Sequence, residues 1–173
     1  MYRSVSLGMF GTQKHHFHLR LITALEIINN KLHYDSSSKG YVDHIKDNRI
    51  VTGSYQQLVS DAVSIGSYAD MYHIFALSAA LNRPIQSYYP PLVSSIFHAE
   101  PYHRKIIGRG VNASEEPAVT VMWTTTRQPH SFEAFEPNHF VPLVRRQAPQ
   151  TPQTINLDDT DNNSDGSSTN VTR

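Results

Sequence analysis

The first apolar pattern along the chain is helical. Tyr2, Val5 and Met9 recur at helical spacing and predict a first helix over about residues 1–8. Glycines at positions 8 and 11 are expected to end this helix, because glycine interrupts a helical pattern. The chain therefore starts inside a predicted helix, with no capping residue before it.

A longer helix is predicted over about residues 12–33, with Thr12 as its N-cap. Its apolar residues follow one another at steps of four, four, three and four, which places them on one side of a helix. We expect this side to be buried. The stripe consists of Phe17, Leu21, Leu25, Ile28 and Leu32.

A third helix is predicted from Ser54, after a polar connection. Ser54 and Gln57 have the spacing of a capping box, in which each side chain satisfies a free backbone N–H of the other residue. Gly66 is expected to end the helix. The residues expected to face inward are Leu58, Ala62 and Ile65.

The same capping spacing recurs at Ser67 and Asp70, and it predicts a fourth helix that starts there. Proline disfavours helical geometry in the residue before it, so Pro84 should end this helix near Asn82. Its apolar face is formed by Ile74, Leu77 and Leu81.

Strand patterns follow the helices at residues 84–89, 118–125 and 139–144. The second run alternates, with Val119, Val121 and Trp123 on one face. Pro142 in the third run is typical of an edge strand or a bulge, because proline cannot donate a hydrogen bond to the ladder. Helices first and strands later predict an α+β domain in which helices pack on a small mixed or antiparallel sheet.

Composition separates the last residues from the rest. Residues 147–173 are rich in Ser, Thr, Asn, Asp and Gln and cannot bury enough apolar surface to form a core, so we expect a disordered tail after a domain over residues 1–146.

The 15 basic and 15 acidic residues balance, which argues against DNA binding through bulk positive charge. No run resembles a membrane span or a secretory signal, and we expect a cytoplasmic or nuclear protein that is not secreted.

Few residues point to chemistry. The 173 residues contain no cysteine, which excludes disulfides and a cysteine nucleophile from this sequence. His15, His16 and His18 cluster, but no acidic or thiolate partner stands at ligand spacing, so we expect neither a metal site nor a cofactor. His139 stands at the start of a predicted strand, between Asn138 and Phe140. A rigid strand end can aim a general base, although a purely structural histidine fits the same pattern.

Four segments in order resemble the ovarian-tumour (OTU) family of cysteine proteases, most of whose active members cleave ubiquitin chains. The segments are "YRSVSLGMFGTQKHHFHLRLITALEI", "GSYADMYHIFALSAALNRPIQSYYP", "AVTVMWTT" and "PNHFVPLV". Together they cover about residues 1–144. The stretch "SYADM…LNRPIQSYYPPL" is most similar to the divergent OTU-like domain of vertnin and related proteins. The resemblance implies an OTU-like, papain-like fold.

The resemblance also implies roles for particular residues. His139 falls on the family's general base, with Asn138, Phe140 and Trp123 as its neighbours. The family's Asp-Gly-x-Cys signature is missing, and Met1 falls directly after the position of the nucleophile. The family's third catalytic residue has no counterpart either. We therefore expect that the chain as written cleaves no ubiquitin chain.

Three hypotheses account for these departures. In the first hypothesis, the sequence is a truncated or mis-started member of the family. The codons upstream of Met1 would test this hypothesis. Alternatively, it is a pseudoenzyme that keeps the fold to bind ubiquitin or another protein. Such a pseudoenzyme could instead be part of a vertnin-like transcriptional regulator that binds DNA. A third hypothesis is a domain derived from a mobile element that has no retained activity.

Overall fold

The computed structural model describes residues 1–42, 53–90, 102–125 and 139–144. The expected domain boundary at residue 146, the tail and Asn138 lie outside these residues. None of the helices described there is long and apolar enough to cross a membrane. The elements are α1 (Tyr2–Phe10), α2 (His16–Asn29), α3 (Lys31–Tyr34), α4 (Tyr55–Val63), α5 (Met71–Leu81), β1 (Ile85–Tyr88), β2 (Arg104–Ile106), β3 (Val119–Thr124) and β4 (His139–Leu143).

The strands form one small mixed sheet in the order β2-β1-β3-β4. β1 and β3 are parallel, whereas the β1–β2 and β3–β4 pairs are antiparallel. The predicted α+β class is confirmed. β4 is an edge strand of this sheet, as Pro142 indicated.

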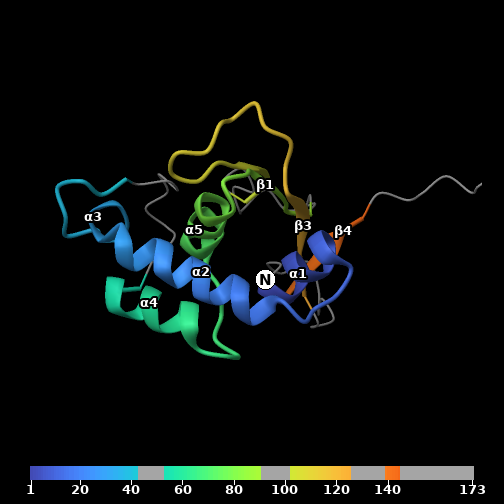
Figure 1. Ribbon diagram of the computed structural model, residues 1–173, viewed down its shortest axis with the longest axis horizontal. Helices are drawn as coiled ribbons and strands as arrows, with labels where there is room; N and C mark the ends of the chain where they lie inside the picture. The colour runs from blue at the N-terminus through green and yellow to red at the C-terminus, as the bar shows by residue number, and fades with distance from the viewer. Residues whose placement is uncertain (43–52, 91–101, 126–138, 145–173) are drawn as a thin grey trace, which may run out of the picture.

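Helices cover the face of the sheet to which Val119, Val121 and Trp123 belong (Figure 1). α1 packs on β3 and β4, and α5 contacts β2, while α2 contacts α1, α4 and α5. The alternation predicted for β3 is confirmed, because Val119, Val121 and Trp123 are buried and the residues between them are partly exposed. The core therefore includes residues of the sheet and of α1, α2, α4 and α5, and α5 is buried over most of its length.

The first turn between helices differs from the prediction. α1 continues through Gly8 to Phe10. Glycine at position 8 serves packing rather than helix termination, because a Cβ there would clash with the Val119 side chain. Gly11, with a φ of 67°, is the residue that ends the helix. Thr12 does not cap α2, which begins only at His16. The buried Ser6 hydroxyl organises the turn instead: it donates to the Thr12 carbonyl and accepts the His15 N–H.

The predicted buried face of α2 is wrong. All five residues of the stripe are exposed, by fractions from 38% for Leu21 to 69% for Leu32. The opposite side of the helix is buried through Leu19, Arg20, Thr23, Ala24 and Ile27. The small residues Thr23 and Ala24 on that side allow α4 and α5 to pack closely. The buried guanidinium of Arg20 is satisfied by hydrogen bonds to backbone carbonyls.

The capping predictions for the next two helices have different outcomes. Ser54 caps α4, since its hydroxyl accepts the Gln57 N–H at 3.2 Å. For α5 the capping box consists of Asp70 and His73 rather than Ser67 and Asp70, so the helix starts at Met71. α5 ends at Leu81 as predicted.

The end of α4 also differs. The helix stops at Val63, before Gly66, and Ile65 is 69% exposed in the loop that follows, so its predicted burial is wrong. The predicted inward positions Leu58 and Ala62 are buried.

The short strand β2 was not predicted, because its three residues carry no apolar alternation. The loop after it packs tightly on α5: the N–H of Gly108 donates to Ser78 Oγ at 3.0 Å. A Cβ at Gly108 would collide with the backbone of Phe75 and Ala79. Gly108 is therefore required by the close approach of two backbones.

Candidate functional site

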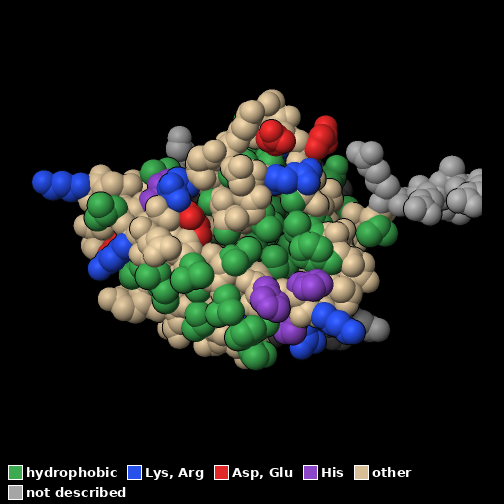
Figure 2. All heavy atoms as spheres, in the orientation of Figure 1, with side chains coloured by type: hydrophobic (Ala, Val, Ile, Leu, Met, Phe, Trp, Pro, Cys, Tyr) green, Lys and Arg blue, Asp and Glu red, His purple; other side chains and the backbone are tan. Residues whose placement is uncertain are grey.

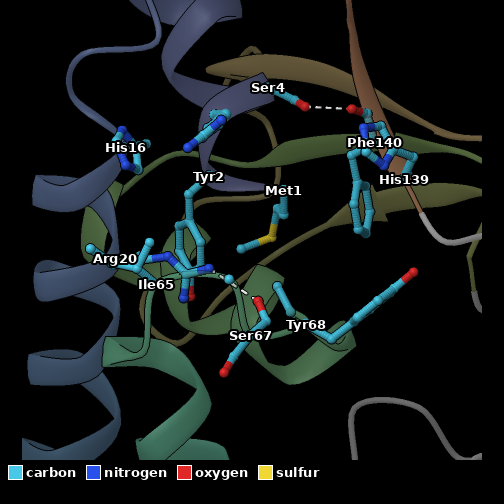
Figure 3. A pocket seen from close by; sticks show the side chains of 13 residues that line it. Met1, Tyr2, Ser4, His16, Arg20, Ile65, Ser67, Tyr68, His139 and Phe140 are labelled. Atoms are coloured by element: carbon cyan, nitrogen blue, oxygen red, sulfur yellow. Dashed lines mark hydrogen bonds between the residues drawn. The ribbon is translucent and has the colours of Figure 1, made fainter.

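A pocket of about 380 Å³ lies where four parts of the chain meet (Figure 3). They are the N-terminus of α1, the first half of α2, the loop between α4 and α5, and the start of β4. The residues that line the pocket are Met1, Tyr2, Arg3, Ser4, His16, Arg20, Ile65, Gly66, Ser67, Tyr68, Ala69, His139 and Phe140. The structure thus brings His139 to the N-terminal end of α1.

A buried hydrogen bond joins α1 to the strand that carries His139. Ser4 Oγ donates to the carbonyl oxygen of Phe140 at 2.5 Å. The Phe140 ring packs on Trp123, with 4.3 Å between the ring centroids, and the indole N–H of Trp123 donates to Ser87 Oγ at 2.8 Å. The predicted neighbours Phe140 and Trp123 therefore lie in the core beside the pocket and fix the backbone position of His139.

His139 itself is exposed at the first position of β4. Among the described residues, no side chain hydrogen-bonds to its ring. Ser4 cannot serve as its nucleophile in this arrangement, because the Ser4 hydroxyl donates its proton to the Phe140 carbonyl. Activation of a serine or thiol by histidine requires the hydroxyl or thiol to donate to the ring.

Arg20 links the floor of the pocket to the rest of the domain, and the sequence prediction missed it. Its guanidinium is buried and donates to the carbonyls of Asp61, Ala62 and Ser67 at 2.8, 3.1 and 3.0 Å. It also lies over the Tyr2 ring, 4.6 Å from the centroid. Arg20 therefore connects α1, α2, the end of α4 and the loop with Tyr68. A lone arginine between the apolar residues of a helix was the available signal.

The pocket lining is basic. It contains Arg3, Arg20, His16 and His139, and none of the described lining residues is acidic. With Met1 as the first residue, burial and the nearby Arg20 charge lower the pKa of its α-amino group to about 5. This group is then neutral at pH 7, and the positive potential comes from the arginines.

The histidine cluster does not act as one unit. His16 faces the pocket, and the rings of His15 and His18 lie 6.2 Å apart outside its lining. Within the described ranges, no three histidine or carboxylate side chains are grouped so that they could hold a metal ion.

Sequence comparison identifies the family. The family described as "Vertnin, OTU domain" matches residues 34–124, more than half of the chain. The chain therefore belongs to the vertnin-type OTU-domain family. The match includes the loop with Tyr68 and strands β1 to β3, whereas α1 and His139 lie outside it.

The chain is also similar to a solved structure, described as the structure of the OTUD1 OTU domain. The two share 22% sequence identity with a TM-score of 0.46, over 70% of each chain. None of the curated proteins compared with the sequence matches it.

Proposed function

We propose that this chain is a non-catalytic OTU-type domain that binds ubiquitin or a similar protein in the pocket at the N-terminus of α1. One observation carries the proposal. His139, to which the family resemblance assigns the role of general base, lines this pocket, but the 173 residues contain no cysteine. The pocket thus offers a histidine, and the sequence given offers no thiol that this histidine could activate.

The chemistry explains why binding is proposed without cleavage. A cysteine protease attacks through a thiolate that its histidine generates. Here His139 has no thiol to deprotonate, and the Ser4 hydroxyl is bound to a carbonyl. The remaining pocket is basic and partly apolar, and it fits the extended end of a polypeptide with a terminal carboxylate. Arg3 and Arg20 supply the complementary charge.

The test is an NMR titration of the isotope-labelled chain with ubiquitin, and with ubiquitin that lacks its C-terminal tail. We expect shifts at pocket residues such as Tyr68 and Ser67 with the intact protein only. Tyr68→Ala should weaken binding, because this 60% exposed ring lines the pocket. Val144→Ala, at an exposed position outside the pocket, is the matched control. If intact ubiquitin shifts no signal, the proposal is refuted.

Cleavage is tested separately with a ubiquitin–fluorophore conjugate. We expect no fluorescence above the rate of spontaneous hydrolysis. A signal that disappears in His139→Ala would show that the chain is an enzyme, and would contradict the non-catalytic part of the proposal.

A second candidate rests on the resemblance to vertnin: a transcriptional regulator that binds DNA. The balanced charge of the chain makes broad electrostatic binding to DNA weak, so a DNA function would require a local basic surface. A titration with duplex DNA at physiological salt distinguishes the candidates. Shifts with DNA and none with ubiquitin would replace the first proposal with the second.

A further inference from the structure

The outward side of α2 is apolar. Phe17, Leu21, Leu25 and Ile28 are exposed by 42%, 38%, 55% and 49%, and Leu32 on α3 by 69%. The other exposed residues of α2 are His18 and Asn29, so this side carries no Lys, Arg, Asp or Glu. Glu26, the acidic residue of the helix, is mostly buried and paired with Arg109 at 2.9 Å.

Such a helix is unusual on the surface of a protein. A helix that is apolar on both sides is normally buried on both sides. The four α2 positions lie within one side of the helix, so their side chains form a continuous stripe. In Figure 2, hydrophobic side chains gather on the face over α2.

The stripe is large enough to form an interface. The exposed fractions amount to about two and a half full side chains, or roughly 500 Å², since a large side chain presents on the order of 200 Å². Two such stripes in contact would bury about 1,000 Å² in total, the lower limit for a specific interface. We therefore expect a weak association.

The order of residues shows which partner fits. Relative to Leu25, the apolar residues lie at −8, −4, +3 and +7, which is nearly symmetric. When two copies pair antiparallel around Leu25, we expect Leu21 to face Ile28 of the other copy, since all three residues lie in α2. Asn30, with a φ of −121°, interrupts the helix before Leu32, so the outer pair of Phe17 and Leu32 is an expectation that the cross-linking experiment below tests. The stripe thus complements itself, as a two-fold interface requires. The five stripe residues carry no charge, and the exposed Lys31 beside Leu32 is paired with Asp35 of its own chain at 3.8 Å, so the stripe offers no feature that favours a charged partner over a second copy.

We propose that two copies of this chain form an antiparallel dimer through the exposed apolar stripe of α2 and α3. The interface lies on the outer side of α2 and does not include the residues that line the pocket. The dimer is therefore independent of whether the pocket binds ubiquitin.

The first experiment is sedimentation velocity of the chain of residues 1–173 over a low- to high-micromolar concentration series. We expect a shift from monomer to dimer. Leu25→Glu should stay monomeric across the series. At the two-fold axis the introduced carboxylates of the two copies would lie against each other, and these like charges repel. Leu25 is 55% exposed, so we expect this change to leave the fold intact, and circular dichroism of the variant is the check.

The matched control is Val144→Glu, which places the same charge at a 72% exposed position beyond β4. It should dimerise like the unmodified chain. A chain that is monomeric at every concentration overturns the proposal. A dimer that survives Leu25→Glu, or one that Val144→Glu also abolishes, overturns the assignment to this stripe.

The second experiment uses the absence of native cysteine, so that each introduced thiol reports one contact. Under a mild oxidant, Leu25→Cys should form a cross-linked dimer with itself. Phe17→Cys should not cross-link with itself, but it should cross-link with Leu32→Cys when the two variants are mixed. Efficient self-linking of Phe17→Cys would mean a parallel arrangement and overturn the proposed dimer.

Discussion

Arg20→Met tests whether one buried guanidinium holds the pocket together. Methionine keeps most of the apolar stem of Arg20 and removes the charge with its donors. The three carbonyls of Asp61, Ala62 and Ser67 then lose their partner. These groups lie at the end of α4 and in the loop after it, so water replaces the guanidinium only in part.

The expected loss is worked from these contacts. Hydrogen bonds to a charged group contribute about 1.5–3 kcal/mol each, but a loop that loses several together relaxes, so the effects do not add. The stacking on Tyr2 adds about 1 kcal/mol. We expect the free energy of unfolding to fall by about 2–4 kcal/mol. Arg20→Lys keeps the positive charge but not the planar set of donors of the guanidinium. Its free energy of unfolding should fall by about half as much as that of Arg20→Met.

The assay is urea unfolding followed by circular dichroism and by the fluorescence of Trp123, the single tryptophan. The Tyr68 and Ser67 amide signals should also move in Arg20→Met, since their loop loses its tie to α2. The opposing argument is that desolvation of a buried charge cancels its hydrogen bonds, so that an apolar replacement is neutral or stabilising. A change below about 0.5 kcal/mol in Arg20→Met would refute our reasoning and support that argument.

Three further predictions concern the core and the caps. Gly108→Ala should destabilise the domain by at least about 2 kcal/mol in urea unfolding, because its Cβ would overlap the backbone of α5; a neutral result would mean that the loop can move away. Trp123→Phe should cost about 1–2 kcal/mol, measured by circular dichroism, since it removes the bond from the indole N–H to Ser87; an unchanged midpoint would show that this bond contributes nothing. Burial alone would raise the pKa of the Asp70 carboxyl, but the hydrogen bonds and charge of His73 lower it below the ordinary value of 3.8. The ionised carboxylate therefore stabilises the fold above that value, and this contribution is lost as the pH falls through the lowered pKa. Asp70→Asn should be less stable than the unmodified chain at pH 6, and the gap should close in acid; a gap independent of pH would contradict this.

The sequence by itself determined much of the local structure. Alternation in β3, the cap at Ser54, the end of α5 near Asn82 and the edge position of Pro142 were all readable, because each depends on neighbouring residues and on backbone geometry. The order of helices before strands gave the α+β class. His139 was identified as a site residue from its place before a strand and from the family resemblance, and it does line the pocket.

Tertiary structure decided which faces are buried and what surrounds His139. Periodicity places Phe17, Leu21, Leu25 and Ile28 on one side of α2, but it does not say whether that side meets the core. The side with small residues and Arg20 packs inward, because small residues allow close helix packing and distant carbonyls satisfy the charge. Those carbonyls follow Arg20 by more than 40 positions in the chain. No local pattern can record such a contact, so only the folded chain reveals both the pocket floor and the exposed stripe.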